Sequence, residues 1–139
     1  MRALFVAALL CGPAGCVWTV DASDVRDSNR EAMLHFDRQI VLTGPFLARA
    51  RRGRLGLAQR RALRTMESCV ERFRRLRARM ARLSARFDRV AGKRGRITSA
   101  DPEWSEVERL RAEYGRIKAS ADQTVEELRQ AAITYLEAG

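Results

Sequence analysis

A long run of apolar residues at steps of three and four constrains this chain more than any other feature. The run lies between positions 57 and 91 and consists of Leu63, Met66, Val70, Phe73, Leu76, Met80, Leu83, Phe87 and Val90. Residues with this spacing share one face of an α-helix, so the run predicts a long amphipathic helix over about 57–91. Such a helix needs at least one partner helix to cover its apolar face.

A second series with the same spacing predicts a helix over about 102–136. Its members are Val107, Leu110, Tyr114, Ile117, Ala121, Thr124, Leu128, Ala131 and Tyr135. When the chain is folded between the two series, their members meet layer by layer, for example Phe87 with Leu110. The sequence therefore predicts a long antiparallel helical hairpin with coiled-coil-like packing.

Charged residues beside the two apolar series fit the same hairpin. Arginines precede many core positions of the first series, and Glu106, Glu113 and Glu127 follow one another at multiples of seven in the second. The two flanks face each other in an antiparallel pair, so we expect contacts such as Arg86 with Glu113 and Arg72 with Glu127.

A shorter helix is predicted over about 22–43, with a thinner apolar face. Asp21 or Ser23 can cap its start, and Gly44 followed by Pro45 predicts its end. A two-helix hairpin buries little surface, so we expect this helix to pack on the hairpin or the chain to form a homodimer. The predicted fold class is all-α, a three-helix bundle with a shorter N-terminal helix.

The first sixteen residues have the pattern of an export signal. Arg2 is a short positive region, residues 3–10 are apolar, and small residues precede a cysteine. Ala14, Gly15 and Cys16 resemble the end of a bacterial lipoprotein signal. The apolar stretch is too short to span a membrane.

This resemblance implies a signal peptide over 1–15 and a single mature helical domain over 16–139. Cys16 would be the lipidation site, carrying palmitate, and Val17 after it implies sorting to the outer membrane. An ordinary cleaved signal and a cytosolic protein are the alternatives. Cys69 is then the only other thiol of the mature chain, and it is either a buried apolar residue or the site of an intermolecular disulfide.

Positive charge is concentrated in the middle of the chain. The net charge is +10, residues 49–96 hold 18 basic and 3 acidic side chains, and 25 of the 27 basic residues are arginine. The guanidinium group suits phosphate and carboxylate, although a solvated arginine-rich face is the simpler explanation of the composition. The arginines that the hairpin leaves unpaired form a candidate site for an anionic partner: Arg49, Arg51, Arg52, Arg54, Arg60, Arg61, Arg64, Arg74 and Arg77.

No catalytic pattern accompanies this charge, and no cofactor or metal is predicted. His35 is the only histidine, and a single histidine is more often a surface or capping residue than a metal ligand. The sequence predicts a non-enzymatic, lipid-anchored binding or scaffold protein of the bacterial cell envelope, facing the periplasm. Its expected partners are the membrane and an envelope protein, anionic lipid or cell-wall polymer.

Two alternative functions remain open. The segment Leu55-Gly-Leu57-Ala-Gln59 is similar to the Leu-Thr-x-x-Gln motif of periplasmic Spy/CpxP-type chaperones, which implies a helical chaperone or stress protein. The basic segment 49–96 could also bind nucleic-acid phosphates, although it lacks aromatic residues for base stacking.

Overall fold

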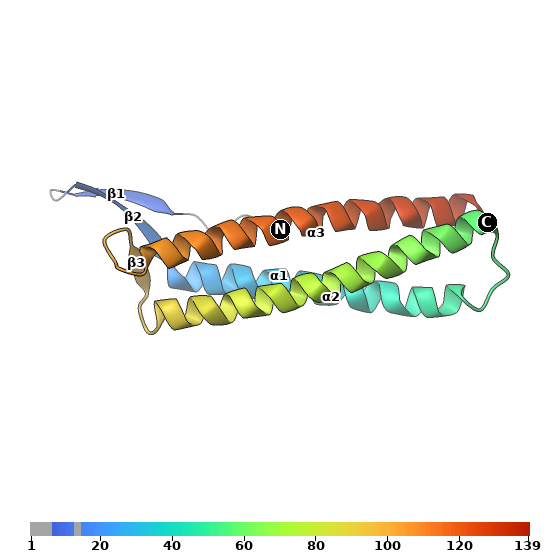
Figure 1. Ribbon diagram of the computed structural model, residues 1–139, viewed down its shortest axis with the longest axis horizontal. Coiled ribbons are helices and arrows are strands. Elements are labelled where there is room, and N and C mark those ends of the chain that lie inside the picture. Colours follow the sequence, from blue (N-terminus) through green and yellow to red (C-terminus); the bar gives the residue numbers. More distant parts are fainter. Residues whose placement is uncertain (1–6, 13–14) are drawn as a thin grey trace. The chain divides into compact units, whose positions relative to one another are not determined.

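The computed structural model describes residues 7–12 and 15–139, and most of these residues are helical (Figure 1). The three predicted helices are present, and their bounds are α1 (Ala22–Ala50), α2 (Leu57–Ala91) and α3 (Trp104–Glu137). No helix in the described residues is long and apolar enough to cross a membrane. The prediction of an all-α fold is incomplete, because the structure also contains a small sheet.

The sheet has three antiparallel strands in the order β1-β2-β3, which are β1 (Ala8–Gly12), β2 (Gly15–Asp21) and β3 (Arg96–Thr98). Val20 of β2 lies opposite Ile97 of β3, and both side chains are buried. The Ser99 N–H donates to the Trp18 carbonyl at 2.8 Å and extends this pairing. β1 lies inside the predicted signal peptide, and β3 lies between the two predicted helices of the hairpin and has only three residues, too few for an alternating pattern to be recognised.

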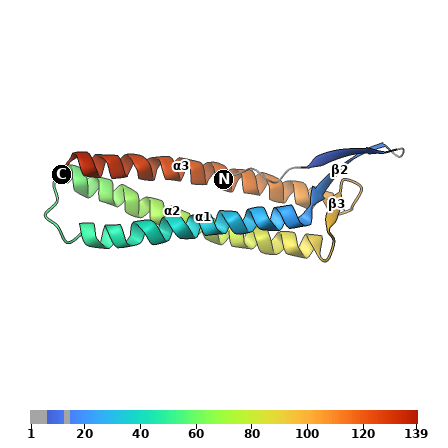
Figure 2. The same cartoon turned by 180° about the vertical axis from the view of Figure 1, so that it is seen from behind.

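The described residues divide into two compact units, and each helix contributes to both of them. Among the described residues, the first unit comprises residues 7–12, 15–33 and Arg79–Arg116, and the second comprises Leu34–Ala78 and Ile117–Gly139. The first unit contains the sheet beside the start of α1, which is visible from both sides (Figures 1 and 2).

The first unit is held together by a core between helices and sheet. Its largest fully buried side chains include Phe87, Ile97 and Leu110. Asp21 caps α1, since its carboxylate accepts hydrogen bonds from the Ser23 N–H at 2.9 Å and the Ser23 hydroxyl at 2.7 Å. These hydrogen bonds lower the pKa of Asp21. Of the two capping residues predicted, Asp21 and Ser23, Asp21 is therefore the one that caps α1.

The second unit buries aromatic and sulfur-containing side chains of α1 and α2, and Tyr135 of α3 is half-buried. The rings of Phe36 and Phe73 lie 6.3 Å apart and are both fully buried, so α1 packs on α2. Phe46 contacts Tyr135 of α3 edge to face at 5.3 Å. Cys69 is fully buried, and this burial raises the pKa of its thiol.

Helix α1 continues through Gly44 and Pro45, so the predicted end at these residues is wrong. A proline inside a helix removes one hydrogen bond and costs about 3 kcal/mol. Thr43 and Leu47, on either side of the pair, are buried in the second unit. Burial of the helix face around Pro45 offsets this cost and carries α1 on to Ala50.

The predicted flank contacts are partly confirmed. Arg72 forms an ion pair with Glu127, and this hydrogen bond lowers the pKa of Glu127. The predicted contact of Arg86 with Glu113 is wrong, because Arg86 pairs with Glu106 and Glu113 accepts from Arg79 at 2.9 Å. Each of these observed pairs lies one heptad away from the predicted partner, within reach of a long arginine side chain.

Candidate anionic-partner site

Seven of the nine predicted site arginines lie together around the junction of α1 and α2 in the second unit. Residues 49–64 contain no acidic side chain. All seven arginines are exposed. We call this group the connector cluster, and its members are Arg49, Arg51, Arg52, Arg54, Arg60, Arg61 and Arg64.

Local structure explains how these side chains come together. Arg49 lies in the last turn of α1, where a cation interacts favourably with the helix dipole. The α1–α2 connection spans only residues 51–56, so the first turns of α2 lie close to it in the chain. The first turn of α2 has no acidic residue, so its positive dipole end adds to the arginine charge. An anion bound here would interact favourably with the arginine side chains and with the N-terminal end of α2.

Most of the connector cluster is not neutralised by the rest of the protein. Arg51 is paired with Glu67, with 2.7 Å between Nη2 and Oε1. Arg60 donates through Nε to the Leu55 carbonyl at 3.0 Å. The remaining five members have no acidic partner in the part of the chain that the structure describes, and these are Arg49, Arg52, Arg54, Arg61 and Arg64.

A shallow hollow of about 250 Å³ lies within the cluster. Its lining includes the guanidinium-bearing side chains of Arg51, Arg60 and Arg64, together with Leu63 and the carboxylate of Glu67. A phosphate or carboxylate entering this hollow would compete with Glu67 for Arg51. Because guanidinium groups bind such anions with two parallel hydrogen bonds, the hollow is suited to an anionic group of that size.

The other two predicted site residues have acidic partners of their own. Arg74 lies 3.3 Å from Glu71 on the same helix, and Arg77 lies 3.2 Å from Asp37 of α1. Both arginines are exposed. They therefore contribute to the helix surface and to the α1–α2 contact, and the unpaired charge lies in the connector cluster.

The predicted lipidation site, Cys16, lies in β2 and is exposed. Its sulfur forms a disulfide with Cys11 of β1, directly opposite in the strand register. A sulfur in a disulfide cannot be acylated, so lipidation requires the reduced form of the protein, in which Cys16 has a free thiol. Two parts of the predicted signal, residues 1–6 and 13–14, lie outside the described residues.

The structure places His35 and Cys69, the two other residues considered from the sequence, in partly or fully buried surroundings. His35 is half-buried, its ring lies 5.9 Å from that of Phe36, and burial lowers the pKa of its imidazole. The Cys69 sulfur lies 3.6 Å from the Arg72 guanidinium and is closed off from solvent. A buried thiol cannot meet a second copy of the chain without local opening.

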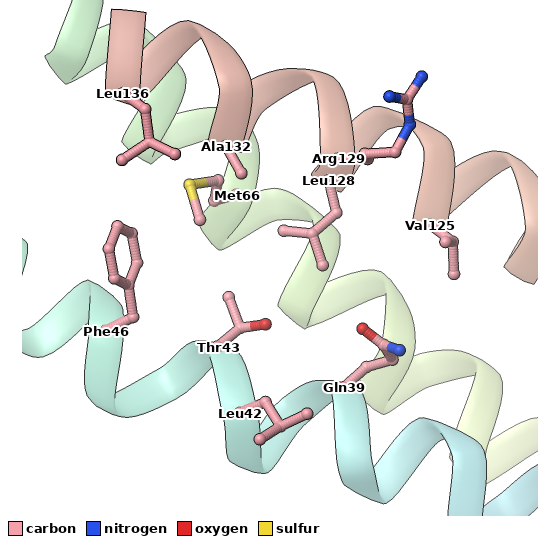
Figure 3. Close-up of a pocket in the computed structure, with 10 residues that line it drawn as sticks. All are labelled: Gln39, Leu42, Thr43, Phe46, Met66, Val125, Leu128, Arg129, Ala132 and Leu136. Carbon is pink, nitrogen blue, oxygen red and sulfur yellow. The ribbon is translucent and has the colours of Figure 1, made fainter.

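A groove between α1 and α3 in the second unit was not predicted (Figure 3). It has a volume of about 480 Å³. Leu42 and Leu136 on its rim are 73% and 72% exposed, which is unusual for leucine. The lining comprises Gln39, Leu42, Thr43, Phe46, Met66, Val125, Leu128, Arg129, Ala132 and Leu136. The apolar face of α1 was predictable from its spacing, but the groove depends on which part of that face the other helices leave uncovered.

Comparison with known proteins adds no family to this description. No protein-family model matches this chain, and no curated protein or solved structure is significantly similar to it. Functional inference therefore rests on the residues themselves.

Proposed function

We propose that this protein is a non-enzymatic binding protein of the bacterial envelope, and that its connector cluster binds an anionic partner. The observation that carries this proposal is the group of five exposed arginines without acidic partners beside the start of α2. The partner class is a surface or polymer that bears phosphate or carboxylate groups. A three-helix bundle is the proposed architecture, supported by contacts of α1 with α2 and of α2 with α3.

Attachment to the membrane through an acylated Cys16 is the second part of the proposal. It rests on the similarity of residues 14–16 to a lipoprotein signal. The mature chain would start at Cys16, face the periplasm and lack Cys11. Mass measurement of the mature N-terminus, with and without the signal-peptidase inhibitor globomycin, tests this part. Loss of palmitate labelling in the Cys16→Ser variant is expected, and labelling that persists would refute the anchor.

A charge-matched pair of variants tests the connector cluster. The first variant changes Arg52, Arg54 and Arg61 to Gln, which removes three cations without placing an acid in the cluster. The control changes Arg38, Arg82 and Arg89 to Gln, and these side chains are exposed and have no acidic partner in the described residues.

Binding to inorganic polyphosphate is then measured over a range of salt concentrations. We expect the wild-type affinity to fall with salt, the first variant to bind about tenfold more weakly, and the control to change by less than about twofold. Equal losses in both variants would mean that net charge alone, rather than the connector cluster, determines binding. Tighter binding to duplex DNA than to polyphosphate would favour the nucleic-acid alternative.

A further inference from the structure

The groove between α1 and α3 has the properties of a ligand site. We infer that it binds a single acyl chain with an anionic head group, such as a fatty acid or a lysophospholipid, with the head at Arg49. This inference goes beyond the proposed function, because it concerns a separate groove and a small ligand, although the head group would share Arg49 with the connector cluster. It depends on the apolar lining, on the shortage of hydrogen-bonding groups in the groove and on the position of one unpaired cation.

The lining of the groove is that of a small-molecule site. Leu42 and Phe46 of α1 face Ala132 and Leu136 of α3, and the Met66 side chain of α2 lies between them (Figure 3). The volume of about 480 Å³ lies within the range of known ligand pockets. Methionine adapts to ligands of varied shape because its side chain is unbranched and flexible.

The few polar groups of the groove favour an acyl chain over an extended peptide. Helical backbones satisfy their own hydrogen bonds, so the walls offer a peptide no free backbone partners. Arg129 donates to both carboxylate oxygens of Glu126, at 2.7 Å and 3.0 Å, and its guanidinium group is directed away from α1 (Figure 3). Only Gln39 and Thr43 remain, and a peptide would leave buried N–H and C=O groups unpaired, whereas an acyl chain has none.

Helix periodicity locates the head group at one end of the groove. Residues 39, 42, 46 and 49 follow one another at steps of three and four, so Arg49 lies on the same face of α1 as Leu42 and Phe46. Arg49 is exposed and has no acidic partner in the described residues. At the opposite end the charge of Arg129 is neutralised by Glu126. An anionic head at the Phe46 end therefore meets the unpaired cation of Arg49, and Arg38 is the other exposed arginine on this face of α1 with no acidic partner in the described residues.

The experiment measures displacement of the fluorescent fatty acid cis-parinarate from the full chain, below the critical micelle concentration. Palmitate and lysophosphatidylglycerol are the anionic competitors, and zwitterionic lysophosphatidylcholine, which has no net charge, is the comparison. We expect both anions to compete. Arg49→Glu should weaken both of them by about fivefold and leave lysophosphatidylcholine unchanged, since an exposed charge contributes roughly 1 kcal/mol or less.

Two substitutions test the groove itself. Leu42→Ser removes an exposed apolar wall and should weaken binding by about tenfold. Ala132→Phe fills the groove and should abolish binding. Leu34→Ser is the matched control, because Leu34 is 50% exposed on α1 and does not line the groove. Circular dichroism and thermal unfolding check that each variant is folded.

Several results would overturn the inference. These are a wild-type chain that does not bind the probe, or Leu42→Ser and Ala132→Phe variants that bind as the wild type does. Sedimentation that shows a dimer of the wild-type chain and a monomer of Leu42→Ser would also overturn the inference, since a second copy of the chain would then cover the groove. The triple variant of Arg52, Arg54 and Arg61 should retain fatty-acid binding, so failure of the proposed function and failure of this inference are distinguishable.

Discussion

Replacement of Gly44 by Ala tests directly whether α1 is one continuous helix. The structure has Gly44 in helical conformation, and a Cβ added there meets no atom within 4 Å outside its neighbouring turns. In a helix interior, glycine is less favourable than alanine by about 1 kcal/mol, but the new Cβ would also crowd the Cδ of Pro45, which disfavours the helical conformation of the residue before a proline. The two effects oppose each other, so Gly44→Ala should change the stability by less than about 1 kcal/mol. If the helix ended at Gly44 in a left-handed cap, alanine would instead cost about 1–2 kcal/mol. A loss as large as that of a left-handed glycine, rather than a change close to zero, would therefore indicate that the helix ends at Gly44.

Two other glycines calibrate this measurement. Gly115 lies inside α3 with no atom within 4 Å of an added Cβ, so Gly115→Ala should also stabilise by about 1 kcal/mol. Gly92 follows α2 with a φ of 56° and has equally open surroundings, so Gly92→Ala should destabilise through backbone strain alone, by about 1–2 kcal/mol.

The assay is urea unfolding followed by far-ultraviolet circular dichroism, with all three variants compared with the wild type. An unchanged m-value supports assignment of the change to stability. A Gly44→Ala variant that loses stability as Gly92→Ala does would refute the continuous helix and restore the predicted end at Thr43. It would also lengthen the connection to α2 and alter the geometry of the connector cluster.

Three further predictions concern buried and paired groups. The hydrogen bond from Arg72 lowers the pKa of Glu127, so this pair should stabilise the protein above pH 4.5 and lose its effect as the pH falls further. In acid unfolding, the free energy of unfolding of the Glu127→Gln variant should therefore depend less on pH than that of the wild type. Cys69 should react with a thiol reagent in urea but not in native buffer, because it is fully buried and its pKa is raised. Asn29→Leu should raise the unfolding free energy by about 2 kcal/mol, because both amide atoms of Asn29 are buried without hydrogen-bond partners in the described structure.

The helical part of the fold was predictable because its periodicity is strong. Eight of the nine apolar residues predicted for the α2 seam are buried, and Val90 is half-buried. Arg72 and Glu127 were predictable as a pair from heptad spacing alone. The choice between Glu106 and Glu113 for Arg86 was not, because both lie within reach of a long flexible side chain and differ by one heptad.

The sheet and the course of α1 depend on tertiary contacts that no local pattern encodes. Val20 and Ile97 lie far apart in the sequence, and their pairing becomes favourable only when both are buried beside the helices. Pro45 is a strong local signal for a helix end, and burial of Thr43 and Leu47 outweighs it. The connector cluster was predictable because its arginines lie close together in the sequence, within residues 49–64, whereas the groove depends on how side chains of three helices pack.

The hydrogen bonds between Trp18 and Ser99 determine how far an anchor on Cys16 could reach. The Trp18 N–H donates to the Ser99 hydroxyl at 3.1 Å, and its carbonyl accepts from the Ser99 N–H at 2.8 Å. Only Cys16 and Val17 precede this fixed point in a mature chain, and two extended residues span about 7 Å. An acylated form would therefore have a very short tether, which would keep Trp18 close to the lipid head groups and restrict the first unit to the immediate membrane surface.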